Sequence, residues 1–234
     1  MQLVDQLAET GQRLFRGRSY LPLLVLPFFA LTFAAGNLRP APTWWKAVCL
    51  LVSLAGLAVR VYVTGSAPEG TSERSTTSIR AVVLNTRGAY SIVRHPLYAA
   101  NTLIALGLTM RSPSWLFPVL VLLLHALYFE RIAIAEERFL RARFGAEFEA
   151  WADRVPALMP RSFGDFVPVP FEWRRAAGEV HALLVVGAGF FVADVLENSR
   201  VAGRFAIGAA AWSLLVATSV PFLIYAARKR VRAR

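Results

Sequence analysis

Residues 205–227 have the sequence FAIGAAAWSLLVATSVPFLIYAA, which contains no Lys, Arg, Asp or Glu. A helix needs about 20 mostly apolar residues to cross about 30 Å of hydrocarbon, so this stretch is long enough for one crossing. A second uncharged run, SYLPLLVLPFFALTFAAGNL, occupies residues 19–38. Both runs predict helices that cross a membrane.

Three further apolar runs lie in the first half of the chain and just beyond it. Residues 44–66 contain Arg60 near the far end of the run, where a long side chain can reach the headgroup layer. Residues 95–110 and 112–129 are separated by Arg-Ser-Pro-Ser. This break predicts a tight helical hairpin with Pro113 at the start of its second helix.

The shortest run, residues 180–193, fits either a membrane span or an interfacial helix. With this run included, the pattern predicts an all-α, polytopic membrane helical bundle of about six transmembrane helices. The sequence contains no evident repeat or separate soluble domain, so residues 1–234 are expected to form a single integral membrane domain.

The composition supports this class of protein. Of the 234 residues, 56% are hydrophobic and 18% are charged, whereas soluble domains have about 45–50% apolar and about 25% charged residues. This balance excludes a disordered or fibrous chain. Cys49 is the single cysteine, so the sequence offers neither a disulfide framework nor a cysteine-based metal site, and no metal is expected.

The formal net charge of +11 is explained by membrane topology. If both termini are cytoplasmic, most Lys and Arg residues fall in cytoplasmic segments, as the positive-inside rule requires. The basic residues then left outside are Arg39, Lys46, Arg111, Arg200 and Arg204. We therefore expect a protein of the bacterial inner membrane that faces anionic lipid, with no nucleic acid as partner.

Polar residues collect in two cytoplasmic segments. The first, GSAPEGTSERSTTSIRAVVLNTRGAYSIVRHPLYAAN, covers residues 65–101. Its Gly/Ser/Thr half fits an ordinary solvated loop. Its end is more specific, because Arg94, His95, Tyr98 and Asn101 meet where the loop enters a membrane helix. Pro96 suits a first helical turn, whose free N–H groups attract anions.

The second segment, residues 130–160, is predicted to continue a membrane helix into the cytoplasm as an amphipathic stretch that ends at Gly145. Glu136 and Glu137 in this stretch fit either surface ion pairs or a site. The rings of Phe144, Phe148 and Trp151 then form an apolar wall. Such a wall serves most often in core packing and occasionally as a cradle for a flat ring.

The strings GAYSIVRHPLYAAN and EERFLRARFGAEFEAWADRVPALMP flank the hydrophobic hairpin. In this order they resemble the isoprenylcysteine carboxyl methyltransferase family, a superfamily of integral membrane enzymes that includes phospholipid methyltransferases. The resemblance covers residues 85–160, which would form the catalytic core. It implies S-adenosylmethionine as methyl donor, with S-adenosylhomocysteine as product. The cofactor would bind near the cytoplasmic face, and a lipophilic acceptor would arrive from the bilayer.

By matching position, the resemblance also implies roles for individual residues. Arg94 and Glu137 would lie beside the transferring methyl group. The cofactor site would contain His95, Pro96, Tyr98, Asn101, Glu136 and Glu137.

The chain departs from the family pattern at two positions. Ala100 stands where the family commonly has Gly, which affects how closely a cofactor can approach this helix. Ala157 stands where a basic residue often follows Val-Pro, so an anion contact from that position is lost. Residues 176–234 lie outside the resemblance, and we expect them to serve in packing or oligomerisation.

The chemistry of the acceptor depends on its charge. A carboxylate or phosphate is anionic at pH 7 and needs no general base, and Arg94 could hold it. An amine acceptor must lose a proton, which Glu137 could take. The arginines of the first polar segment favour an anion and hence O-methylation. A fainter similarity to bacterial lipid A phosphate methyltransferases would make Arg74 and Arg80, with Arg94, contacts for the substrate.

Three other functions stay open. Phosphatidylethanolamine N-methylation belongs to the same superfamily. Membrane sterol-type reductases, which use NADPH, carry a similar Arg-x-x-His-Pro-x-Tyr pattern, although the Glu-Glu, Phe-Gly and Val-Pro series here fits the methyltransferases better. A transporter or assembly factor has little support, because the expected spans lack a central acidic residue and neither half repeats the other.

Overall fold

A computed structural model describes residues 3–17, 21–35, 40–68 and 81–232. The described parts contain helices and loops, with one isolated bridge pairing Gly88 with Val167. The helices are α1 (Leu3–Gly17), α2 (Leu21–Ala34), α3 (Thr43–Ser66), α4 (Pro96–Thr109), α5 (Leu116–Phe144), α6 (Ala146–Ala152), α7 (Trp173–Ala176), α8 (Val180–Ala202) and α9 (Ala209–Arg232), with the 3-10 turns η1 (Ala89–Ser91) and η2 (Ala177–Glu179).

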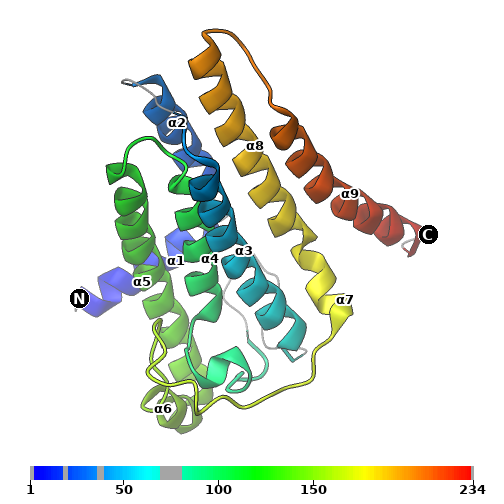
Figure 1. The fold of residues 1–234 in the computed structure, drawn as a ribbon. Helices are drawn as coiled ribbons and strands as arrows, with labels where there is room; N and C mark the ends of the chain where they lie inside the picture. Colours follow the sequence, from blue (N-terminus) through cyan, green and yellow to red (C-terminus); the bar gives the residue numbers. More distant parts are fainter. Residues whose placement is uncertain (1–2, 18–20, 36–39, 69–80, 233–234) are drawn as a thin grey trace.

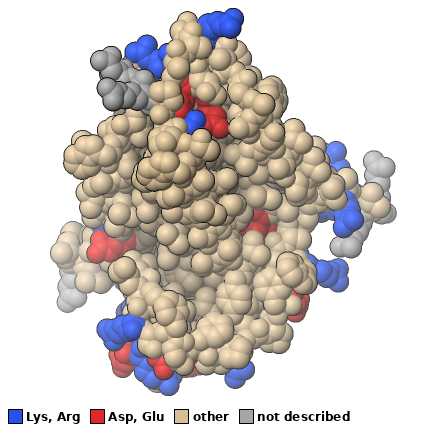
Figure 2. Space-filling view, in the orientation of Figure 1, with Lys and Arg blue, Asp and Glu red and all other residues tan. Residues whose placement is uncertain are grey.

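The arrangement is that of a helical membrane bundle, as the sequence predicts. Within the part of the chain that the structure describes, four helical stretches are long and apolar enough to cross a membrane, and two shorter apolar helices accompany them. Figure 1 shows α1 running crosswise to α5. In the view of Figure 2, most of the surface between the two ends of the molecule is uncharged, with charged side chains at its sides and one small acidic patch near the middle. The long stretches are Thr43–Ser66, Leu116–Phe144, Trp173–Ala202 and Ala209–Val231, and the shorter ones are Leu24–Ala34 and Pro96–Thr109.

The shortest apolar run, residues 180–193, belongs to a helix that is long enough to cross a membrane. α8 continues past Ala193 and includes Asp194 and Glu197. Both acids are neutralised inside the bundle by Arg111, whose Nη2 lies 2.7 Å from Asp194 Oδ1 and 2.5 Å from Glu197 Oε2. Lys46 Nζ adds a contact of 2.9 Å to Glu197. Residues 180–193 are therefore part of a span rather than an interfacial helix.

The hairpin between α4 and α5 differs from the prediction in one detail. α4 ends at Thr109 and α5 begins at Leu116, so Pro113 lies in the connecting turn and not in the second helix. Ser112 explains the late start, because its Oγ accepts a hydrogen bond of 3.1 Å from the backbone N–H of Ser114 and stabilises the turn.

Small residues bring α3 and α4 into close contact. A Cβ atom at Gly56 would lie 2.6 Å from the carbonyl oxygen of Ala100, and one at Gly107 would lie 2.4 Å from that of Cys49. Ser53 donates a hydrogen bond of 2.9 Å to the Ile104 carbonyl across the same contact. Ala100 is fully buried, so the residue that departs from the family pattern packs where α3 supplies Gly56.

Helix α1 is amphipathic and lies against α5. Its buried residues are Ala8, Gly11 and Phe15. A Cβ atom at Gly11 would come 1.9 Å from the carbonyl oxygen of Arg131, so only glycine permits this approach. The Tyr128 hydroxyl donates a hydrogen bond of 2.8 Å to the Leu14 carbonyl and holds the end of α1 in place.

The α3–α4 contact leads to a stability prediction. Gly107→Ala should lower the free energy of unfolding by about 1–3 kcal/mol, because the added methyl group has no space. The measurement is the midpoint of thermal unfolding of the purified protein in detergent. Gly17→Ala is the matched control, since nothing lies within 4 Å of a Cβ atom there. Equal midpoints for the two variants would contradict the close packing.

Candidate active site

The segment that carries Arg94 and His95 is held by the Val-Pro segment of the second motif. The Arg94 backbone N–H donates to the Pro156 carbonyl at 2.9 Å, and that of His95 donates to the Ala157 carbonyl at 3.0 Å. His95 is the residue before α4, and Pro96 opens that helix as predicted. Figure 1 shows η1, the start of α4 and α6 at the same end of the bundle.

The Arg94 guanidinium lies between α5 and the loop after α6. Its Nε donates to Glu137 Oε1 at 2.8 Å, and its Nη2 donates to Glu137 Oε2 at 3.4 Å. Its Nη1 donates to the carbonyl oxygens of Ala152 at 2.6 Å and Val155 at 2.9 Å. The two side chains of the ion pair are 16% and 17% exposed, so the pair is largely shielded from water.

The imidazole of His95 bridges two neighbouring carboxylates. Its Nε2 lies 3.0 Å from Glu137 Oε1, and its Nδ1 lies 3.5 Å from Glu136 Oε2. Burial by itself would lower the pKa of His95, but hydrogen bonds and attraction from Glu136 and Glu137 outweigh it and leave this pKa raised. This arrangement therefore favours a protonated imidazole, whose two N–H groups donate to the two carboxylates.

Aromatic rings support this imidazole from behind. The Tyr98 ring stacks on His95, with centroids 5.3 Å apart and planes at 10°. It also stacks on Phe129 of α5, with centroids 4.6 Å apart and planes at 11°. The stack joins the start of α4 to α5 and restricts the orientation of the imidazole.

The apolar wall of the second motif contributes to the core. Phe148 and Trp151 are buried and cluster with Leu84, and Phe144 packs against them. The Trp151 indole N–H donates a hydrogen bond of 3.0 Å to the Tyr90 carbonyl in η1. Of the two roles considered for this wall, the structure favours core packing, and Trp151 also fixes the turn that precedes Arg94.

Asn101 lies in a second polar cluster. Its Oδ1 accepts a hydrogen bond from Nη1 of Arg60. Arg60 Nε lies 2.8 Å from Glu179 Oε2, and the Thr64 hydroxyl donates to Glu179 Oε1 at 2.9 Å. Arg60 is thus paired inside the bundle, and not only directed towards headgroups. The sequence offered one signal for Glu179, an acid directly before an apolar run.

The structure brings some of the predicted site residues together and does not describe others. Arg94, His95, Tyr98, Glu136 and Glu137 are brought together by the contacts above. Arg74 and Arg80, predicted to contact the substrate, lie outside the described residues. Among the residues that the structure describes, no group of three or more His, Cys, Asp or Glu side chains could hold a metal ion.

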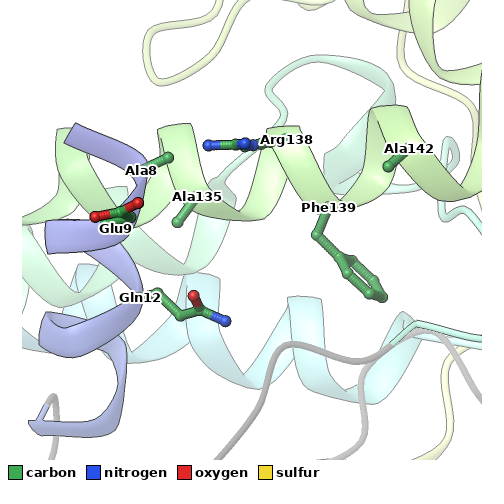
Figure 3. Close-up of a pocket in the computed structure, with 7 residues that line it drawn as sticks. All are labelled: Ala8, Glu9, Gln12, Ala135, Arg138, Phe139 and Ala142. Atoms are coloured by element: carbon green, nitrogen blue, oxygen red, sulfur yellow. The ribbon is translucent and has the colours of Figure 1, made fainter. Parts of the chain in front are cut away.

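A groove of about 550 Å³ lies in the angle between α1 and α5 (Figure 3). In Figure 3, Gln12 and Phe139 extend into it, and Ala8 and Ala135 lie where the helices meet. On α5 it uses positions three, four and seven residues apart, which form a different helix face from Glu136 and Glu137. It is therefore separate from the site around His95. Its lining is Ala8, Glu9, Gln12, Ala135, Arg138, Phe139 and Ala142.

Comparison with known proteins gives a match where the site lies. Residues 68–147 match the model of a family described as phospholipid methyltransferase. The matched segment includes Arg94, His95, Glu136 and Glu137, so the resemblance predicted from the motifs is confirmed for this part of the chain. No solved structure matches.

Two curated relatives are similar to this chain over 146 residues each. The cobalt-zinc-cadmium resistance protein CzcN of Cupriavidus metallidurans is 29% identical over 146 residues, which cover 59% of this chain and 61% of the relative. The nickel-cobalt-cadmium resistance protein NccN of Alcaligenes xylosoxydans xylosoxydans is 28% identical over 146 residues, which cover 59% of this chain and 62% of the relative. The match thus spans less than two thirds of either relative.

The structure is thus a helical membrane bundle that contains a segment similar to the phospholipid methyltransferase family.

The bridging imidazole generates a prediction about pH. Because the pKa of His95 is raised in the folded protein, the stabilisation by its contacts is complete below the ordinary pKa of about 6.5 and is lost as pH rises through the raised value. His95→Gln should therefore reduce the midpoint of thermal unfolding more at about pH 6 than at about pH 9.

His181→Gln serves as the control for this experiment, because His181 is exposed and its contacts are with the Gly178 carbonyl and the edges of the Phe222 and Tyr225 rings rather than with a pair of carboxylates. The control should change the midpoint little at either pH. A stability difference between wild type and His95→Gln that stays constant with pH would mean that the imidazole is not held as a cation.

Proposed function

We propose that the protein is an S-adenosylmethionine-dependent methyltransferase that acts at the cytoplasmic membrane face on a lipophilic acceptor. The proposed reaction is O-methylation of a carboxylate, as in an isoprenylcysteine, or of a lipid phosphate. One observation carries the proposal: within the matched segment, the carboxylate of Glu137 is held by Arg94 and His95 at the end of the bundle where α4 begins.

The residues present suit the proposed cofactor. The side chains of Glu136 and Glu137 are 22% and 17% exposed and offer carboxylates to a cationic sulfonium, an ammonium group or hydroxyl groups. His95 and the first turn of α4 suit a carboxylate. When bound, S-adenosylmethionine supplies an electrophilic methyl group on sulfur. We place it against His95, Tyr98, Glu136 and Glu137, with Pro96 shaping the turn and Asn101 offering its amide.

Arg94 acts mainly by orienting Glu137 in this proposal. A guanidinium has five N–H groups, and four hydrogen bonds of Arg94 go to Glu137 and to two backbone carbonyls. One N–H group, on Nη2, is left to contact an anionic acceptor. Arg94 thereby joins the cofactor carboxylates to the substrate, and a fixed geometry of this kind lowers the barrier of an in-line displacement.

The same contacts favour an anionic acceptor over an amine. An amine must give up a proton, and Glu137 is the carboxylate proposed to take it. However, Glu137 Oε1 already accepts from Arg94 and His95, and Oε2 from Arg94. A carboxylate and a phosphate need no base, because both are anionic at neutral pH. N-methylation of a phospholipid amine is therefore our second choice.

We further propose that residues 85–160 form the catalytic core and that residues 176–234 are a packing addition. The ion pairs of Arg111 and Lys46 with α8 support this division, since they fix the added helices to α3 and to the α4–α5 turn. We also propose cytoplasmic termini and a location in the bacterial inner membrane, an orientation that the basic residues around the site and at the end of α9 support.

The roles of the two central residues predict the behaviour of variants. Glu137→Gln and Arg94→Ala should each reduce methyl transfer by about 100-fold or more, because each breaks the held carboxylate geometry. The measurement is transfer of label from S-adenosylmethionine to a host lipid extract. Glu130→Gln, on the same helix with a 58% exposed side chain, is the control and should retain activity. Full activity in both site variants would place the site elsewhere.

The cofactor can be tested without turnover. S-adenosylhomocysteine should raise the midpoint of thermal unfolding of the purified wild-type protein, because a ligand that binds the folded state stabilises it. NADPH should leave the midpoint unchanged. Stabilisation by NADPH alone would support a sterol-type reductase and contradict the proposal.

The acceptor is identified by mass analysis of the lipid that gains the label. Under base treatment, a carboxylate methyl ester, a phosphate methyl ester and a methylated amine release the label to different extents. If the label is stable to base and lies on an amine, the reaction is N-methylation and the proposal of O-methylation is wrong.

A further inference from the structure

A row of packed rings leads from the candidate active site to α1. The His95 imidazole stacks on Tyr98, and Tyr98 stacks on Phe129 of α5. Phe129 belongs to a buried cluster with Ile132 and with Phe15 of α1, and Tyr98 packs against this cluster. Phe15 is 5% exposed, so it occupies an enclosed position behind the ring stack.

Helix α1 lies outside the segment that matches the methyltransferase family. Three contacts nevertheless fix it to α5. Gly11 lies directly against the Arg131 carbonyl. The Tyr128 hydroxyl donates to the Leu14 carbonyl at 2.8 Å, and Arg138 forms an ion pair of 3.0 Å with Asp5. These contacts place Phe15 beside α5 about two turns before Glu136 and Glu137.

The ring stack determines how His95 can turn. The imidazole faces Glu136 and Glu137 on α5, Tyr98 on α4 and the neighbouring Arg94, while Tyr90 of η1 lies near Glu136. Only a narrow range of ring orientations directs its two nitrogens at two carboxylates. Loss of Phe15 would leave a cavity beside Phe129, into which Phe129 and then Tyr98 can relax.

We propose that Phe15 of α1 is a positioning residue for methyl transfer, acting through Phe129 and Tyr98 to hold the His95 imidazole against Glu136 and Glu137. This inference rests on the proposed function for its catalytic consequence. α1 thus completes the site from outside the family segment.

The test compares Phe15→Ala with the wild-type protein in lipid nanodiscs. Two quantities are measured: kcat for methyl transfer, and the pH midpoint of the His95 imidazole by NMR. His95→Gln assigns the resonance among the three histidines. We expect kcat to fall about tenfold, because the carboxylates lose their alignment. We expect the His95 midpoint to fall by at least about half a pH unit, because burial persists while the carboxylate contacts weaken.

Phe33→Ala is the matched control. Phe33 is an equally large ring, 2% exposed, in the cluster of Phe29 and Ala193. It should destabilise the protein to a similar extent and leave the His95 midpoint and kcat unchanged. If Phe15→Ala does not fold, Phe15→Leu retains apolar volume but lacks a flat ring, and it should change both quantities in the same direction by less.

The outcomes separate this inference from the proposed function. A Phe15→Ala protein with an unchanged His95 midpoint and with kcat within about twofold of wild type overturns the inference. Equal changes in Phe15→Ala and Phe33→Ala also overturn it, since they indicate general destabilisation. If the wild-type protein transfers no methyl group, the proposed function fails, and the His95 midpoint alone decides whether Phe15 orients the imidazole.

Discussion

The carboxylate of Glu137 is the group on which the geometry of the site depends. It accepts hydrogen bonds from Arg94 and His95 and so joins the loop before α4 to the C-terminal part of α5. A partly buried carboxylate is stable only when it is paired, and removal of one partner leaves a shielded charge without compensation. The backbone bonds from Arg94 and His95 to Pro156 and Ala157 complete a closed arrangement of both motifs.

Two other ion pairs act in the same way between membrane helices. Arg60 connects α3 to Glu179 before α8, and Arg111 connects the α4–α5 turn to Glu197 in α8. Apolar side chains discriminate poorly between lipid and a neighbouring helix, because both surroundings are apolar. Charged groups in such surroundings require specific partners. These pairs therefore decide which helices are neighbours, while glycines such as Gly56 decide how closely they approach.

The sequence was sufficient to predict those features of the fold that depend on neighbouring residues. Uncharged runs predicted the membrane helices, Pro96 predicted the start of α4, and Gly145, with φ of 51°, ends α5 as expected. The extent of α8 could not be predicted in this way. From the sequence alone, the acidic residues Asp194 and Glu197 indicate that the apolar helix ends before them. The structure shows that Lys46 and Arg111, far away in the sequence, form ion pairs in this part of α8. Ser112 likewise moved the start of α5 beyond Pro113 through a turn of its own.

The sequence alone determined the class of fold and the two polar motifs, because helix length, hydropathy and capping depend on neighbouring residues. The tertiary structure decided how the motif side chains are used. It placed Asn101 with Arg60, used the Trp151 N–H to hold η1, and put Phe15 behind the ring stack at His95. These contacts join residues that are far apart in the chain, and only the packing of the helices brings them within reach.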